Sequence, residues 1–142
     1  MRAGEARIQI KMGLNGSGIY DVRVESEMEK LKIAIPTMGS KGLDDRVSDI
    51  FGRAKTFTII EISDGSIGNV DIIENPAISY KHGVGPIVIK MLTDMGVSAV
   101  AFNEMGVGAS ILLDQNNIRK VKVESGIPVR EAVKAILKEL EQ

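Results

Sequence analysis

From residue 31 onward the chain repeats short apolar runs rich in branched residues, and in its second half stretches with helical spacing separate them. The first run, Leu31–Pro36, ends at a proline and is typical of a buried strand. The turn-forming steps Asp64-Gly65 and Gly68-Asn69 separate the next two runs, which predicts that these form a hairpin. The predicted strands are Leu31–Pro36, Thr56–Ile62, Val70–Ile73, Ser98–Phe102 and Lys120–Val123.

Three helices are predicted after this hairpin. Pro86–Met95 stops at Gly96, Gly106–Asp114 follows the fourth strand, and Pro128–Leu140 has its proline in the first turn. The order is therefore β-β-β-α-β-α-β-α, and right-handed crossovers would set strands four and five parallel to strand one. We expect an α/β fold with a mixed five-stranded sheet and helices on both faces, a three-layer arrangement that resembles the ribonuclease H-like architecture.

Residues 1–30 have a different pattern. Arg7–Met12 and Ile19–Glu25 alternate apolar with polar residues around an Asn-Gly pair, which predicts a β-hairpin. The alternative is a non-native upstream segment, with the functional chain starting near Met28. A lone hairpin is marginal in water, so it would have to pack on the main domain or on a neighbouring subunit. The predicted division is an N-terminal extension at 1–30 and one domain at 31–142.

Bulk properties exclude several classes of partner. A chain of 142 residues suits a single core, and its net charge of −1 gives no overall attraction to nucleic acid or to an anionic membrane. No apolar run approaches the ~20 residues of a membrane helix, and the N-terminus has no signal-peptide core. We expect a cytoplasmic monomer or weak homodimer that binds neither nucleic acid nor membranes.

The inventory of metal ligands is also narrow. The chain has no cysteine, which excludes disulfides and the usual thiolate-ligated zinc and iron–sulfur sites. Its one histidine, His82, excludes a multi-histidine site within one chain. Any anion site must therefore be a local arrangement.

Four stretches stand out by their order along the chain. They are Ile33–Thr37 with Leu43–Ala54, Glu74–Pro76 with His82–Pro86, Asn103–Ala109, and Val121–Val133. Together they resemble the dinitrogenase iron–molybdenum cofactor biosynthesis family, which includes orange-protein-like domains, over about residues 31–140. The first stretch and the His-Gly-Val-Gly-Pro segment are specific in combination, although each alone is a weak signal.

This resemblance implies a carrier and not an enzyme. Members of the family hold the iron–molybdenum cofactor, its precursors, or molybdenum- and copper-containing sulfide clusters, and some are domains of larger cofactor-assembly proteins. The implied cargo is a loosely and non-covalently bound iron–molybdenum–sulfur or molybdenum–copper–sulfide cluster, and the implied partners are cluster-assembly proteins. A preassembled cluster carries its own sulfide ligands, so a chain without cysteine fits this role.

The candidate site follows from helix ends and loops. Gly83 and Gly85 allow close backbone approach just before a predicted helix, and helix N-termini attract anions. Asn103–Gly108 repeats this pattern after the fourth strand, and the predicted topology opens the loops after strands one, three and four at one edge. No catalytic residue is expected. The candidate cofactor-binding residues are His82, Gly83, Gly85, Asn103, Gly106, Gly108, Arg46 and Arg53, with His82 also the metal ligand.

Each candidate has an ordinary structural alternative. His82 could bond a backbone carbonyl, the glycines could serve only turns and caps, and the two arginines could pair with local aspartates. Phe51 is expected in the core, and the methionines of the helices are expected in packing. The residues concerned are Asp44, Asp45 and Asp49 for the ion pairs and Met91, Met95 and Met105 for the packing.

Three rival functions can be weighed from the same residues. A metal-dependent nuclease of ribonuclease H-like fold needs an acidic residue on the first strand, and Lys32–Pro36 has none. A small-anion or nucleotide-responsive regulator could use the same glycine loops, but no complete phosphate-loop fingerprint is present. An interaction module could use the N-terminal hairpin to dock a partner. The chain has no triad or Cys–His signature of classical catalysis.

Overall fold

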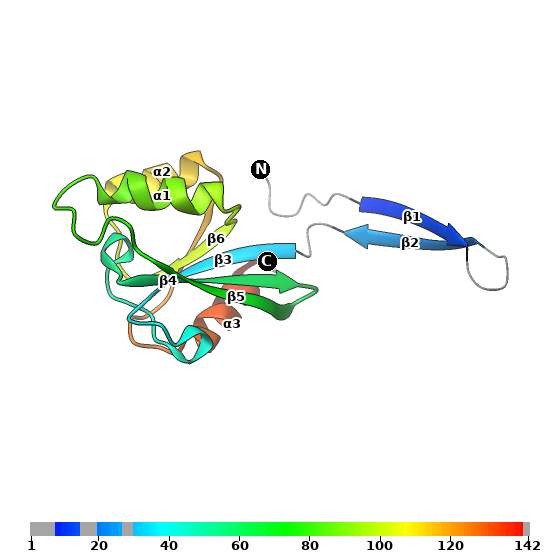
Figure 1. Cartoon of the computed structure of the whole chain (residues 1–142), viewed down its shortest axis with the longest axis horizontal. Helices are drawn as coiled ribbons and strands as arrows, with labels where there is room; N and C mark the ends of the chain where they lie inside the picture. Colours follow the sequence, from blue (N-terminus) through cyan, green and yellow to red (C-terminus); the bar gives the residue numbers. More distant parts are fainter. Residues whose placement is uncertain (1–7, 15–19, 27–29, 141–142) are drawn as a thin grey trace.

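Five strands of the protein are hydrogen-bonded into one mixed sheet. The computed structural model describes residues 8–14, 20–26 and 30–140, and in the last of these ranges the sheet order is β5-β4-β3-β6-β7. Figure 1 labels the first four of these strands. The strands are β3 (Lys30–Thr37), β4 (Thr56–Ser63), β5 (Ser66–Glu74), β6 (Ala99–Phe102) and β7 (Arg119–Lys122).

The strand directions decide which loops share an edge. β4 is antiparallel to both β3 and β5, whereas β6 is parallel to β3 and to β7. β3, β5, β6 and β7 therefore all run in one direction, and their carboxyl ends lie at the same edge of the sheet. Over residues 30–140, the predicted α/β class with a mixed five-stranded sheet and three helices is confirmed. The ribonuclease H-like classification stays a prediction.

The helices form two layers around the sheet. α1 (Val84–Asp94) and α2 (Val107–Gln115) cover one face, and α3 (Val129–Leu140) covers the other (Figure 1). Each layer encloses its own set of buried apolar side chains, because every strand turns alternate residues to opposite faces. Phe51 is fully buried under α1, and Met91, Met95 and Met105 pack around the same cluster, so both packing predictions are confirmed.

The β4–β5 connection differs in part from the prediction. Asp64 and Gly65 form its two-residue turn with φ of 53° and 76°, a backbone form that matches the twist of paired strands. Gly68-Asn69 lies inside β5, so the prediction that this step turns the chain was wrong. The tight turn alone reverses the chain. The pairing of β4 with β5 changes register once, between Ile60 and Ile62, as at a β-bulge.

Two further strands lie in the N-terminal part of the chain. β1 (Ile8–Leu14) and β2 (Tyr20–Ser26) pair antiparallel as a separate two-stranded sheet, with Leu14 opposite Tyr20 and Ile8 opposite Ser26 (Figure 1). The Asn-Gly pair expected between them and the alternative start near Met28 lie outside the described residues. No helix within the described ranges is long and apolar enough to cross a membrane.

Candidate anion-binding site

The loops after β3 and β6 are joined by backbone hydrogen bonds. The amide of Phe51 donates to the carbonyl oxygen of Glu104 at 2.9 Å, and the Glu104 amide donates to the Asp49 carbonyl at 3.0 Å. These bonds form an isolated parallel bridge between Ile50 and Glu104 beyond the ends of the two strands. The two loops therefore form one continuous surface at the carboxyl edge.

The loop after β5 is bound to the same surface. The Asn75 side-chain amide donates to the carbonyl oxygens of Gly52 and Ala54, at 2.9 Å each, and its Oδ1 accepts from the Ala77 amide at 2.9 Å. Only 3% of Asn75 is exposed. Gly52 lies in the short 3-10 helix η3 (Phe51–Arg53), so Asn75 holds this helix against the start of the β5–α1 loop.

The N-termini of α1 and α2 lie next to each other at this edge. A Cβ atom built on Gly85, in the first turn of α1, would lie 3.6 Å from Cβ of Ala109, in the first turn of α2. Gly83 and Gly106 precede the two helices, and no side chain caps either one. The first amides of each helix have no partner within their own helix, so two partial positive charges and several N–H donors face the same region.

The conformation at Gly83 explains where α1 begins. Gly83 has φ of 73°, the left-handed form that glycine adopts without strain, and this turns the chain into a helix that starts at Val84. Pro86 is therefore the third helical residue, not the first as the sequence predicted. At that position the N–H it lacks has no intrahelical acceptor, so proline removes no hydrogen bond.

His82 lies directly before this helix start. It is exposed, and its side chain makes no hydrogen bond or ion pair with any residue from 30 to 140. A bond to a backbone carbonyl, the ordinary alternative for this residue, is therefore not formed within that range. Its ring nitrogens can reach solvent or a ligand.

Arg46 and Asn103 are directed elsewhere. The Arg46 guanidinium donates to the Gly126 carbonyl at 2.7 Å, beside the segment that leads into α3 on the opposite face of the sheet. Asn103 Nδ2 donates to the carbonyl of Val123, which follows β7, at 3.3 Å. The structure groups His82, Gly83, Gly85, Gly106 and Gly108 at the two helix ends, but it engages Arg46 and Asn103 in other contacts.

The pairing of the arginines with nearby aspartates, the ordinary alternative for these residues, is not formed in residues 30–140. Arg53 donates to the backbone carbonyls of Tyr80 and Lys81, the latter at 2.8 Å. Asp45 instead accepts bonds from three backbone amides of its own loop, and Asp44 lies 3.7 Å from Arg130. Backbone groups, and not opposite charges, are thus the partners of both arginines.

Two residues of the stretches that carry the resemblance, although not among the candidate site residues, shape this edge. Asn75 connects η3 to the β5–α1 loop, and its signal in the sequence was the Asn-Pro step, which favours side-chain-to-backbone turns. Gly52 allows η3 to approach α1, because a Cβ there would lie only 3.2 Å from Cγ1 of Val84. No local pattern marks Gly52, since its neighbour is distant along the chain.

Exposed apolar side chains lie on the elements that meet at this edge. Val107 is 77% exposed and Ile111, one turn later in α2, is 50% exposed. Ile50 and Tyr80, on the two loops joined to this edge, are 45% and 50% exposed. These exposed side chains of the adjoining elements, Ile50, Tyr80, Val107 and Ile111, are here called the apolar rim. Residues 30–140 contain no group of three or more His, Cys, Asp or Glu side chains arranged to hold a bare metal cation.

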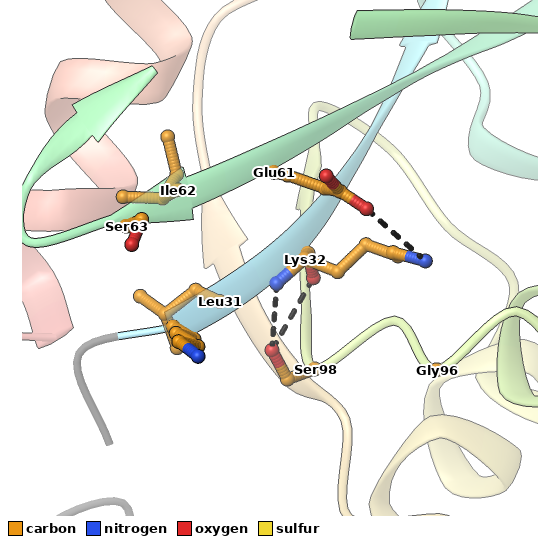
Figure 2. A pocket seen from close by; sticks show the side chains of 8 residues that line it. Leu31, Lys32, Glu61, Ile62, Ser63, Gly96 and Ser98 are labelled. Atoms are coloured by element: carbon orange, nitrogen blue, oxygen red, sulfur yellow. Dashed lines mark hydrogen bonds and ion pairs between the residues drawn. The ribbon is translucent and has the colours of Figure 1, made fainter. Parts of the chain in front are cut away.

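A pocket is present at the other end of the sheet. It has a volume of about 470 Å³ and lies at the amino end of β3, between Leu31, Ile62 and Gly96 (Figure 2). Lys32 Nζ approaches Glu61 Oε1 at 3.7 Å there and also donates to the Met95 carbonyl at 3.0 Å. None of the candidate site residues lines this pocket.

Comparisons with known proteins agree with this architecture. The family described as dinitrogenase iron–molybdenum cofactor matches residues 30–139. A protein of Methanocaldococcus jannaschii described as uncharacterized is 33% identical over 111 residues, which are 78% of this chain and 89% of that protein.

Two solved structures extend the comparison. The apo form of the orange protein from Desulfovibrio gigas superposes with a TM-score of 0.68 and 26% identity, over 77% of this chain and 88% of that one. A Thermotoga protein described as a NifB candidate has a TM-score of 0.62 and 35% identity, over 76% and 88% of the two chains. This chain belongs to the dinitrogenase iron–molybdenum cofactor family.

Proposed function

We propose that this protein is a non-catalytic carrier of an anionic metal–sulfur cluster, similar to the iron–molybdenum cofactor or a molybdenum–copper sulfide. The observation that carries the proposal is the adjacency of two uncapped helix N-termini, with the Gly85 and Ala109 positions in van der Waals range. Each such end binds anions through free N–H groups and its partial positive charge, and two ends that share one region add their effects.

The chemistry of the edge suits a cluster that arrives assembled. Sulfide ligands already complete most of the coordination of such a cluster, so the carrier supplies amide donors and at most one exchangeable ligand. We propose His82 as that ligand, as neutral imidazole on a metal or as a protonated donor to sulfide. Gly83, Gly85, Gly106 and Gly108 would then form the backbone lining.

The apolar rim supports a large polarisable anion over a small hydrated one. Ile50, Val107 and Ile111 have purely hydrocarbon side chains and Tyr80 adds an aromatic ring, whereas the surface of a metal sulfide is soft and weakly hydrated. The region is also open, so binding would be loose and release to a cluster-assembly protein would need no large rearrangement. We assign Arg46 no direct contact with the cluster, because its Nη1 donates to the Gly126 carbonyl beside the segment that leads into α3.

The family and its structural relatives point in the same direction. The family description names the iron–molybdenum cofactor of dinitrogenase. The compared structures include an orange protein and a NifB candidate. We extend this association to the present chain as a proposal, together with a cytoplasmic location and donor or acceptor proteins of the cluster-assembly type.

Anaerobic titration tests the proposal. The apo-protein is mixed with tetrathiomolybdate plus a copper(I) or iron(II) salt, desalted by gel filtration, and examined by visible absorption. We expect colour to co-elute with the protein and to decrease several-fold in His82→Ala, with Lys90→Ala on the outer face of α1 as a control that leaves it unchanged. No retained colour with either metal, together with saturable binding of inorganic phosphate or a nucleotide, would favour an anion-responsive regulatory module.

A further inference from the structure

We propose that Arg53 does not meet the bound anion but positions the residues that do. Together with Asn75 it forms a reciprocal clasp between η3 and the β5–α1 loop, and this clasp fixes His82 and the first amides of α1. The inference rests on the proposed function for the identity of the ligand. The clasp itself is a property of the protein without ligand.

The first half of the clasp is the Arg53 side chain. Its Nη1 donates to the Tyr80 carbonyl and its Nη2 donates to the Lys81 carbonyl at 2.8 Å. Guanidinium is a planar fork of fixed N–H directions, so two bonds to consecutive carbonyls fix its orientation and its other three N–H groups cannot turn independently toward a ligand. An arginine engaged in this way fixes the path of the chain immediately before His82.

The second half is the return contact from Asn75. Its Nδ2 donates to the carbonyls of Gly52 and Ala54, the residues on either side of Arg53 in the chain. The Asn75 backbone amide also donates to the Lys55 carbonyl at 3.1 Å. The backbone that carries Arg53 is therefore held by the loop that Arg53 in turn holds.

The segment between the two contacts has few other restraints. Residues 78–83 contain no helix or strand, and the backbone bonds from Ile78 and Tyr80 reach only to Asn75 and Ala77 within the same loop. Within residues 30–140, Arg53 supplies the only side-chain hydrogen bonds to this segment from another element. Removing that contact should free His82 and the turn at Gly83 without disturbing the buried core.

Charge-preserving substitution separates positioning from a counter-charge role. Lysine keeps the positive charge but offers a single ammonium group that cannot reproduce a fork onto two carbonyls. If Arg53 positions the loop, Arg53→Lys and Arg53→Gln should have similar effects. If it neutralises the bound anion, Arg53→Lys should retain most of the affinity and only Arg53→Gln should lose it.

The experiment combines backbone dynamics of the apo-protein with binding of a defined probe. We expect ¹⁵N order parameters of residues 80–83 to fall from about 0.85 toward about 0.6 in both variants, as for a loop that becomes flexible. Tetrathiomolybdate affinity, with copper(I) present, should fall in both by about tenfold, the scale of a lost hydrogen bond to a charged group. Lys55→Gln, which removes a positive charge two residues away on an exposed side chain, is the control and should change neither readout.

The outcomes are distinguishable from failure of the proposed function. Unchanged order parameters in both variants would overturn the clasp, as would full retention of affinity by Arg53→Lys. Loss of order in both variants, together with a wild-type protein that retains no colour, would support the clasp and overturn the cluster-carrier proposal.

Discussion

At the scale of single residues, the candidate edge is stabilised mainly by side chains that bond backbone groups. Asp45, which is 5% exposed, accepts from the amides of Gly39, Lys41 and Arg46. Asn75 performs the corresponding role for the β5–α1 loop. Loops have no ladder to satisfy their polar backbone atoms, so buried acceptors and donors of this kind fix their shape.

The first prediction concerns Asn75. Asn75→Asp is isosteric and keeps the acceptor for Ala77, but it removes the donors to Gly52 and Ala54 and places a carboxylate opposite two carbonyl oxygens. We expect the free energy of unfolding to fall by about 1–3 kcal/mol, the cost of leaving buried polar groups unsatisfied. Urea denaturation of the variant and the wild type measures this difference in the free energy of unfolding. Asn69→Asp on the exposed strand β5 is the control. It also loses an amide donor and sets a carboxylate beside that of Asp71, but in solvent, so it should cost no more than about 0.5 kcal/mol. Equal effects of the two changes would refute the role of Asn75.

The second prediction compares the two glycines that precede the helices. Gly83→Ala should destabilise the protein by about 1 kcal/mol, because alanine at φ of 73° suffers a steric clash with its own backbone. Gly106 has φ of −66° and open space around its Cβ position, so Gly106→Ala should change stability by no more than about 0.5 kcal/mol. Thermal unfolding of both variants tests the difference. A smaller loss of stability in Gly83→Ala than in Gly106→Ala would contradict the left-handed conformation of Gly83 before α1.

The sequence predicted the backbone part of the candidate site better than its side chains. Glycines before two helices and the common edge of parallel strands follow from local patterns, and the structure brings these segments together. The partners of Arg46 and Arg53 could not be predicted, because each guanidinium binds carbonyls far along the chain, at Gly126 and at Tyr80 and Lys81. Neighbouring aspartates suggested ion pairs, yet exposed pairs of that kind contribute little to stability.

At the scale of secondary structure, the number and order of the elements in residues 30–140 agree with the prediction, but β5 (Ser66–Glu74) starts four residues before the predicted strand Val70–Ile73 and α1 starts two residues early. Apolar runs and turn residues mark the strands, and even the short strand β6 is placed within one residue of its prediction. The start of α1 was less predictable, because proline in a first turn is compatible with several positions. The left-handed conformation of Gly83, which fixes that start, is allowed by glycine but not required by it.

The third prediction belongs to α2. Gly108→Glu places a negative charge in the first turn, where a Cβ meets nothing within 4 Å. Replacing glycine in a helix and adding an acidic residue near its N-terminus should each favour folding, so stability should rise by about 0.5–1 kcal/mol. Tetrathiomolybdate binding should fall at least about fivefold, because the same charge repels an anion at that end.

A matched variant at the other end of the helix isolates the position of the charge. Gln115→Glu adds the same negative charge to the last residue of α2 and should leave the affinity within about twofold, since the dipole effect acts within the terminal turn. Thermal unfolding and the gel-filtration assay are measured on both proteins. If both variants bind the probe equally well, the end of α2 does not contribute to the site.

At the scale of the whole molecule, residues 30–140 contain a complete sheet with a buried cluster on each face. The clusters combine side chains from both ends of this range, for example Ile33 with Ile136 and Ala34 with Leu113. The matched family region, 30–139, spans almost the same residues. The division predicted from sequence therefore leads to a proposal that the folding unit starts at β3 and does not need the β1–β2 hairpin.

The last prediction tests this boundary by deletion. A chain that starts at Lys30 should unfold cooperatively, with a free energy of unfolding within about 1 kcal/mol of the full chain, because the sheet and both clusters stay intact. A chain that starts at Ile33 is the control, since it removes the first residues of β3, which pair with Glu61, Ile62 and Ser63 of β4. The free energy of unfolding of this shorter chain should be lower by about 2 kcal/mol or more, because backbone groups of β4 lose their partners and the contacts of Leu31 are lost. Loss of cooperative unfolding in the first chain would mean that the hairpin is part of the folding unit, and a change of its elution volume alone would assign the hairpin to self-association.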